Sequence, residues 1–209
     1  MVFLFNTIYF LQQHPHIILG IDPGTLVMGY GLIAINKNNV SLVEMGVLQL
    51  AKNKNHAERL ELIYKKMDSL IKLHKPASVA IEAPFFGKNV QSMLKLGRAQ
   101  GVAIAAAMMG GLQAAEYAPR KIKQSITGRG SATKEQVWQM LQHILKFEDD
   151  VRFMDATDAV AVALCHHYQS RFEVLKAGNG PAKSIPKSSS GKKNSWNTFI
   201  SSHPDRVKK

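Results

Sequence analysis

Three consecutive strand patterns near the start of the chain restrict its fold more than any other feature. Residues 17–21 form a short apolar run, and residues 29–36 and 40–50 follow as two further strand patterns joined by a turn at residues 37–39. The first run ends in Asp22-Pro23-Gly24-Thr25, where the proline and the glycine stop the strand and force a turn. We therefore expect an antiparallel meander of three strands, with the carboxylate of Asp22 at the end of the first.

Helical and strand patterns alternate after the meander. Residues 56–73 have the apolar spacing of an amphipathic helix, and residues 78–81 form a buried strand that ends in Glu82. The remaining patterns are helices over 90–109, 133–145 and 155–168 and a strand over 112–117. The order βββαβαβαα predicts an α/β fold: a five-stranded mixed sheet, three antiparallel strands followed by βαβ units, with helices on both faces. In the 90–109 helix, we expect Gly97 and Gly101 to let another backbone approach closely.

Length and cysteine content favour one domain in a reducing compartment. The 209 residues suit a single sizeable core, and we expect an N-terminal extension over 1–16, a domain over 17–172 and a basic, disordered tail over 173–209. Cys165 is the single cysteine, so an internal disulfide and a Cys₄ or Cys₂His₂ zinc site are excluded. No apolar run reaches the roughly 18 residues of a membrane span, and we expect a cytoplasmic protein without membrane contact.

The charge balance points to a polyanionic partner. Lys and Arg number 27 against 15 Asp and Glu, which gives a formal net charge of +12. Eight basic residues and one acid lie between Lys176 and Lys209, in a segment that suits a solubilising tail and a nonspecific nucleic-acid arm equally well. Within the predicted domain, the stretch from Arg120 to Lys134 contains five basic residues and no acid.

Four acids stand where the predicted fold can bring them together. Asp22 and Glu82 end two strands, and Asp155 and Asp158 share one face at the start of the last helix. Clustered carboxylates repel one another and must hold protons or bind cations, and oxygen-only ligands suit Mg²⁺ or Mn²⁺. Two such ions about 4 Å apart can clamp an in-line phosphoryl displacement. Taken one by one, Asp22 could be an ordinary turn residue, and Asp155 and Asp158 could be acids that stabilise the first turn of a helix. A single metal site, however, accounts for all four acids.

Two segments near these acids are predicted to contact nucleic acid. Phe85 lies in a loop between Pro84 and Gly87, where its ring can stack on an unpaired base, and Lys88 belongs to a basic stretch without acids. The segment 128–134 lacks the Gly-Lys-Ser/Thr ending of a phosphate loop, so we interpret it as a helix N-terminus with Lys134 positioned to hold a backbone phosphate. The histidines 143, 166 and 167 suit packed or surface positions better than metal ligation.

Several motifs occur together in the order and spacing of a known family. They are Gly20-Ile21-Asp22-Pro23-Gly24-Thr25 with Gly29-Tyr30-Gly31, Ile81-Glu82, Lys88-Asn89, Leu96-Gly97-Arg98-Ala99-Gln100-Gly101, and Asp155-Ala156-Thr157-Asp158-Ala159. Over about residues 17–168, the sequence resembles the RuvC family of Holliday-junction resolvases. The N-terminal extension and the long basic tail fall outside the usual pattern of that family.

The resemblance implies an RNase H-like fold, a homodimer, a branch-migration motor as partner, and Mg²⁺-dependent symmetric nicking of four-way junction DNA in homologous recombination and DNA repair. By motif match, two Mg²⁺ ions, or Mn²⁺ in their place, would be bound by the catalytic acids Asp22, Glu82, Asp155 and Asp158. Phe85 would occupy the junction-stacking position, and Lys123 and Lys134 the positions that contact phosphate.

Three other functions share part of this evidence. Actin-like ATPases and sugar kinases also open with an Asp-Pro-Gly-Thr hairpin, but they need a second lobe with another phosphate loop, for which 209 residues leave no room. An RNase H-like nuclease acting on RNA–DNA hybrids or transposon ends has the same acids. A DNA-binding module would carry them as structural residues, and its activity would survive Asp22→Asn.

Overall fold

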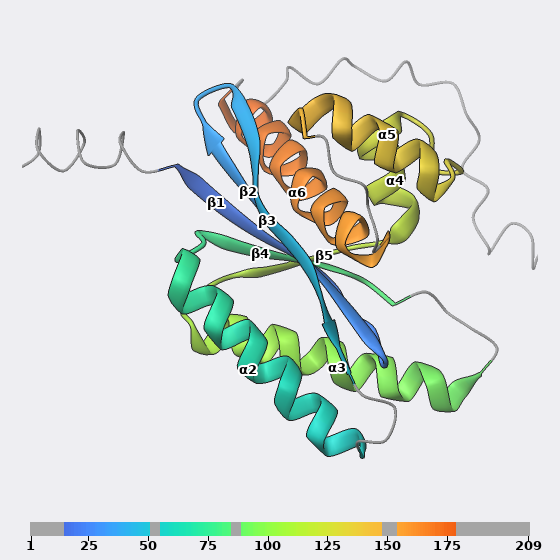
Figure 1. Cartoon of the computed structure of the whole chain (residues 1–209). Coiled ribbons are helices and arrows are strands. Elements are labelled where there is room, and N and C mark those ends of the chain that lie inside the picture. Colours follow the sequence, from blue (N-terminus) through green and yellow to red (C-terminus); the bar gives the residue numbers. More distant parts are fainter. Residues whose placement is uncertain (1–14, 51–54, 85–88, 148–153, 179–209) are drawn as a thin grey trace, which may run out of the picture. The chain divides into compact units, whose positions relative to one another are not determined.

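The computed structural model describes residues 15–50, 55–84, 89–147 and 154–178, and its centre is a five-stranded sheet (Figure 1). The strands are β1 (His16–Asp22), β2 (Val27–Asn36), β3 (Asn39–Gln49), β4 (Ser78–Glu82) and β5 (Ala114–Tyr117). They lie in the order β3-β2-β1-β4-β5, in which β1, β2 and β3 pair antiparallel while β4 and β5 run parallel to β1. The predicted mixed sheet is confirmed.

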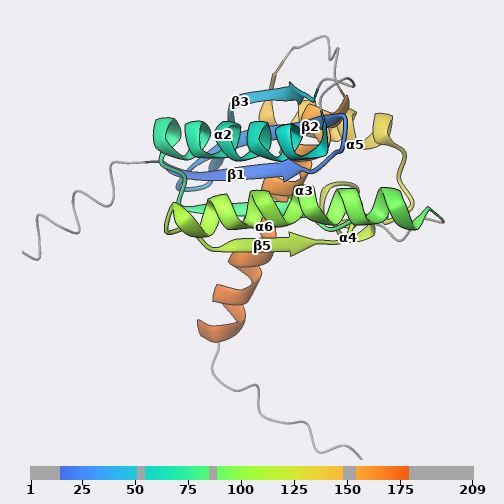
Figure 2. The same cartoon turned by 90° about the horizontal axis from the view of Figure 1, so that it is seen from below.

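Helices cover both faces of this sheet, as predicted. One face packs against α2 (His56–His74) and α3 (Val90–Met109), and the other against α4 (Pro119–Thr127), α5 (Lys134–Leu145) and α6 (Met154–Gly178), as Figures 1 and 2 show. Successive strand residues point to opposite faces, so Ile18 belongs to the α4–α6 core and Leu19 to the α2–α3 core. None of the helices in the described residues has an apolar stretch long enough to cross a bilayer.

Glycines in the first two strands let the backbone of α6 lie directly on the sheet. A Cβ atom on Gly29 would lie 1.9 Å from the carbonyl oxygen of Asp155, and one on Gly20 would lie 2.0 Å from that of Ala159. No side chain larger than hydrogen fits at either position without moving backbone. The start of α6 is therefore held against the carboxyl end of β1, where Asp22 lies.

The structure differs from the sequence-based expectation in three places. Helix α4 was not predicted, and the end of α6 lies at Gly178 rather than at Tyr168, so the first residues of the predicted tail are helical. Gly97 and Gly101 were expected to receive another backbone, but among the described residues no atom outside their own helix lies within 4 Å of a Cβ built on either. Within the described residues of a single chain, the close approach occurs at the strand glycines instead.

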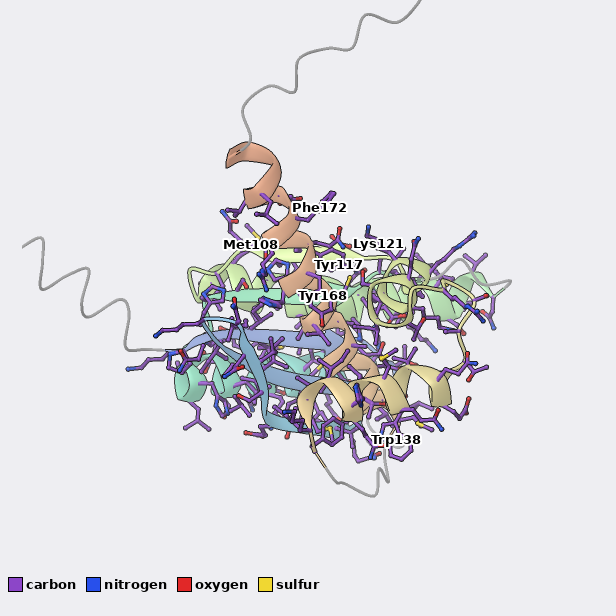
Figure 3. All side chains as sticks on the ribbon, turned by 90° about the horizontal axis from the view of Figure 1, so that it is seen from above. Met108, Tyr117, Lys121, Trp138, Tyr168 and Phe172 are labelled. Atoms are coloured by element: carbon purple, nitrogen blue, oxygen red, sulfur yellow. The ribbon has the colours of Figure 1, made fainter. Side chains whose placement is uncertain are left out.

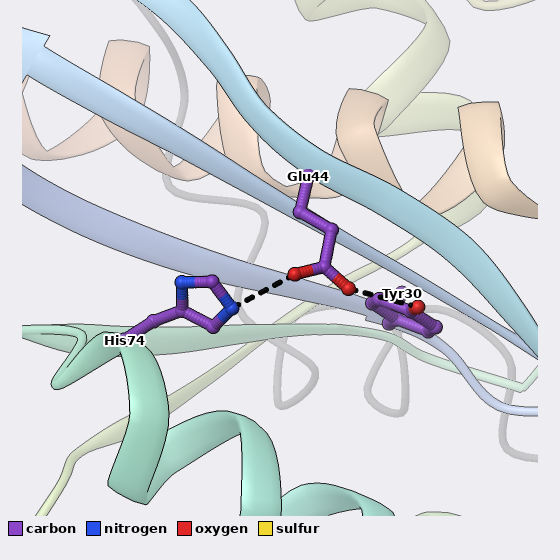
Figure 4. A network of polar contacts seen from close by, with 3 residues as sticks. All are labelled: Tyr30, Glu44 and His74. Atoms are coloured by element: carbon purple, nitrogen blue, oxygen red, sulfur yellow. Dashed lines mark hydrogen bonds and ion pairs between the residues drawn. The ribbon is translucent and has the colours of Figure 1, made fainter.

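Two polar networks tie helices to the sheet. In Figure 4, Glu44 of β3 accepts a hydrogen bond from the Tyr30 hydroxyl at 3.0 Å and contacts Nε2 of His74, at the end of α2, at 2.9 Å. On the other side of the sheet, the Tyr117 hydroxyl lies 2.8 Å from Nδ1 of His166, and Figure 3 shows Tyr117 beside α6. His166 is thus a packed residue of α6, as its sequence context suggested.

Candidate metal centre

Three acidic side chains meet at one edge of the sheet. Asp22 is the last residue of β1, and Asp155 and Asp158 lie in the first turns of α6. One carboxylate oxygen from each of the three lies within 4.8 Å of the other two. The strand supplies one ligand and the helix supplies two, because residues three apart on a helix share a face.

Glu82 joins this region from the neighbouring strand. It ends β4, which runs parallel to β1, so both strands deliver their final carboxylate to the same edge. Glu82 is not one of the three residues that share the 4.8 Å group, but it lines a hollow of about 190 Å³ with Asp22 and Asp158. We call this space the metal hollow; its remaining lining residues are Pro119, Ile122, Lys123, Lys134, Val137 and Ala161.

The electrostatics of the metal hollow favour a bound cation. Burial, followed by the charges of Glu82, Asp158 and Asp155, raises the pKa of Asp22 to about 8. Burial and the charge of Asp158 raise the pKa of Glu82 to about 7. In the metal-free protein these carboxyl groups therefore retain protons near neutral pH, which is the response expected of clustered acids without enough positive charge nearby.

Lys134 supplies part of the missing positive charge. It is the first residue of α5, whose N-cap Thr133 and Gln136 form a capping box that fixes the backbone there. Its ammonium group donates a hydrogen bond to Oδ2 of Asp158. Burial acts to lower the pKa of Lys134, but the hydrogen bond and the charge of Asp158 outweigh it, and the pKa is raised.

Lys123 reaches the metal hollow from α4, the helix that was not predicted. The helix begins at Pro119 and is anchored by the buried side chains of Ile122 and Ile126, one turn apart. Among the described residues Lys123 makes no ion pair with a carboxylate, so its ammonium group is available to an anionic ligand. The two lysines thus line the same hollow as Asp22, Glu82 and Asp158.

The donor set fits Mg²⁺ or Mn²⁺. These ions prefer oxygen ligands, and the cluster offers carboxylate oxygens alone. Binding a divalent cation would also relieve the repulsion that raises the pKa of Asp22 and Glu82.

The predicted nucleic-acid contacts fall into two groups. Lys123 and Lys134 line the metal hollow, whereas Phe85 and Lys88 lie outside the described residues. Gln100, which was given no role of its own within the motif at residues 96–101, is a residue of α3 that is only 7% exposed and lines a second hollow beside the acids. The sequence did contain a sign of this position: Gln100 is a polar residue among the alanines through which α3 packs on the sheet.

Comparison with known proteins gives a consistent result. The sequence model of the family described as "Crossover junction endodeoxyribonuclease RuvC" matches residues 18–166. The RuvC of Cytophaga hutchinsonii is 52% identical over 192 residues, which are 92% of this chain and 88% of that protein. The RuvC of Porphyromonas gingivalis is 47% identical over 200 residues, which are 95% of this chain and 100% of that protein.

A solved structure shares the fold described above. T. thermophilus RuvC in complex with Holliday junction substrate superposes with a TM-score of 0.72 and 30% sequence identity. The superposition covers 76% of this chain and 96% of that chain.

Proposed function

The chain belongs to the RuvC family of crossover junction endodeoxyribonucleases, and on that premise we propose that it resolves four-way DNA junctions by hydrolysing one phosphodiester bond in each of two strands. The observation that carries the proposal is the group of three carboxylate oxygens within 4.8 Å of one another, with Lys123 and Lys134 lining the same hollow as two of the acids. This arrangement joins a site for divalent cations to a site for a phosphate.

The acids would hold two divalent cations, Mg²⁺ with Mn²⁺ as a substitute. Asp22, Asp155 and Asp158 would provide the oxygens that lie together, and Glu82 would complete the set from β4. When bound, such a pair of ions supplies an activated water and stabilises the leaving 3′ oxygen. The carboxylates must lose their protons to take part, so metal binding and proton release are linked.

The lysines would hold the scissile phosphate. Lys123 is free of carboxylate partners in the described part of the chain and can pair with a phosphate oxygen directly. Lys134 starts from its contact with Asp158, and its flexible stem allows the ammonium group to move to the phosphate once Asp158 binds a cation. From the family resemblance, we also assign base stacking to Phe85, and we place Lys88, which belongs to a basic stretch without acids, among the DNA contacts.

Symmetric nicking requires two active sites, and we propose that the second is supplied by another copy of the chain. The face of α3 away from the sheet supports this proposal. Val90 and Leu94 are 69% and 56% exposed there, and the open backbone at Gly97 and Gly101 allows a second helix to approach closely. Sedimentation should give a dimer, and Gly101→Leu should weaken it.

Family membership also supports a cellular setting for the reaction. We propose that the enzyme acts in the cytoplasm in homologous recombination and DNA repair, beside a branch-migration motor that moves the junction past it. Junction cleavage should be faster when such a motor and its nucleotide are added than with the nuclease alone.

The direct test compares cleavage of a synthetic four-way junction with cleavage of a linear duplex, with and without Mg²⁺. We expect paired nicks in the junction only when Mg²⁺ is present. Glu82→Gln and Asp155→Asn should each slow cutting by a factor on the order of 100 or more while junction binding in Ca²⁺ persists. The matched control is Asp68→Asn, an exposed acid of α2 paired with Lys72, which should cut normally. Cleavage of the duplex at the same rate, or cutting by Glu82→Gln at the normal rate, would refute the proposal.

A further inference from the structure

Strand β3 lies at one edge of the sheet and is paired on one side only (Figure 2). Within the described residues its partner is β2, and no other backbone group forms a hydrogen bond with it. The strand is 11 residues long, and its one charged residue, Glu44, is occupied by Tyr30 and His74. Proteins ordinarily protect an open edge with lysine, proline, a short strand or a bulge, and β3 has only the last of these, a register shift beside Val43. Such an edge is well suited to accept a further strand.

The helices on both faces of the sheet reach β3. Val40, Leu42 and Met45 pack against the core formed with α4, α5 and α6, and Leu48 packs against the core formed with α2 and α3. All four side chains are only partly buried, and Val43 is 43% exposed. A strand added outside β3 would therefore find apolar neighbours on both of its faces.

The N-terminal segment, which lies outside the described residues, has the composition of such a strand. Residues 1–11 contain no charged residue, no glycine and no proline. The β-branched and aromatic residues that favour strands prevail among them: Val2, Phe3, Phe5, Thr7, Ile8, Tyr9 and Phe10. A short continuous apolar run with this enrichment is typical of a strand that is buried on both faces.

The start of β1 lies within reach of the open edge of β3. His16 pairs with Ile35 of β2, and Ile35 pairs with Val40, so the start of β1 is level with the start of β3. Neighbouring strands are about 4.8 Å apart, so a strand outside β3 would lie about 14 Å from β1. Residues 11–15 can span about 16 Å when extended, which leaves residues 2–10 to run along β3.

We propose that residues 2–10 form a sixth strand, which pairs antiparallel with β3 of the same chain. The direction follows from the connection: a segment that leads into the start of β1 runs towards the end of the sheet from which β3 departs. With β1, β2 and β3 it makes a Greek key, in which the first of four antiparallel strands lies beside the fourth. The added strand closes the open edge and extends the apolar layer on each face of the sheet. The inference does not depend on the proposed nuclease function.

The test measures hydrogen exchange of the β3 amides in the full-length chain by mass spectrometry. About half of the amides of an antiparallel strand face each neighbour, so an open edge would leave about half of those at residues 39–49 to exchange rapidly. We expect nearly all of them to be protected, at low and at high protein concentration. In the double variant Phe5→Pro/Ile8→Pro, the amides on the outer side of β3 should exchange at least about tenfold faster. Positions 5 and 8 point their amides in opposite directions, so one of the two prolines removes an amide that faces β3.

A matched control and the unaltered chain make the test decisive. Gln12→Pro introduces the same residue into the connecting segment and should keep the protection. The measurement on the unaltered chain carries the test if the double variant does not fold. The inference is overturned if about half of the β3 amides exchange rapidly in the unaltered chain, or if the double variant keeps the protection. Protection that appears only at high protein concentration would also overturn it, because another copy of the chain would then cover the edge.

Discussion

Replacing Asp22 by asparagine should stabilise the metal-free protein and abolish its cutting. The substitution keeps the shape of the side chain and removes a carboxyl group that burial and the charges of Glu82, Asp158 and Asp155 force to hold a proton in the folded chain. An active-site substitution that raises stability while it destroys function is the signature of a site whose charges are balanced only by a ligand.

The size of the gain follows from the raised pKa of Asp22. The carboxyl has an ordinary pKa of 3.8 and a pKa of about 8 in the folded chain, so the folded state holds its proton more tightly than the unfolded state does. At pH 7 the unfolded chain has lost this proton, and the gap of about three pH units between pH 7 and the ordinary pKa corresponds to about 4 kcal/mol. Because the protein relaxes around a buried charge, we expect Asp22→Asn to gain between about 2 and 4 kcal/mol at pH 7.

The dependence on pH gives a sharper test than the gain alone. Since the folded pKa of Asp22 is raised, the destabilisation grows as the pH rises from about 4 to about 8 and is constant above that range. Glu82, with its pKa raised to about 7, acts in the same direction. The unaltered protein should therefore lose stability across this window more steeply than Asp22→Asn.

The assay is urea unfolding in EDTA, followed by circular dichroism, at several pH values between about 4.5 and about 8.5, the window in which these carboxyl groups titrate. Saturating Mg²⁺ or Mn²⁺ should close the gap, because the metal stabilises only the protein that binds it. Asp68→Asn is the control and should show no gain. If Asp22→Asn were less stable than the unaltered protein at pH 8, or if the difference did not vary with pH, the account of the metal hollow would be wrong.

Three further substitutions test other parts of the structure. Gly29→Ala places a methyl group against the carbonyl of Asp155, so it should lower the free energy of unfolding by about 2 kcal/mol. It should also weaken Mn²⁺ binding measured by calorimetry, and an unchanged Mn²⁺ affinity would contradict the close contact. Lys134→Ala frees Asp158, so DNA-free protein should bind Mn²⁺ roughly threefold to tenfold more tightly. The affinity of the variant for the junction should fall, and tighter junction binding would contradict the phosphate contact assigned to Lys134. Glu44→Gln disrupts the network in Figure 4 and should cost about 1 kcal/mol in urea unfolding with normal cutting, whereas lost cutting would mean that the network reaches the site.

The strand ends were the most predictable part of the site. A buried apolar run followed directly by an acid, as at Ile81-Glu82, indicates a functional position, since a carboxylate there needs a partner. From the order of the elements, we expected functional residues at the carboxyl ends of the strands. In the structure β1 and β4 are neighbours, so their final acids lie at the same edge of the sheet. The distance between Asp22 and the acids of α6 could not be obtained in this way, because it depends on how closely that helix packs.

The sequence was less informative where packing decides the outcome. Glycines occur in both α3 and the strands, and the sequence does not say which of them receive another backbone of the same chain: among the described residues, Gly20 and Gly29 do, and Gly97 and Gly101 do not. Helix α4 was not predicted, because its segment was interpreted only as a run of basic residues. Pro119 at its start and Gly128 after its end are nevertheless ordinary helix boundaries. The hydrogen bond between Gln100 and Glu116 joins distant elements and leaves no trace in local spacing.

The division of the acids between β1 and α6 has a consequence for the order in which the protein becomes active during synthesis. Asp22 leaves the ribosome with the first described strand, and the basic residues of α4 and α5 follow well before Asp155 and Asp158. An unfinished chain therefore contains the basic residues that attract nucleic acid before it contains all four acids of the proposed metal site. On the proposed function, a chain that ends before α6 lacks two of the four acids, so it should bind nucleic acid without cutting it.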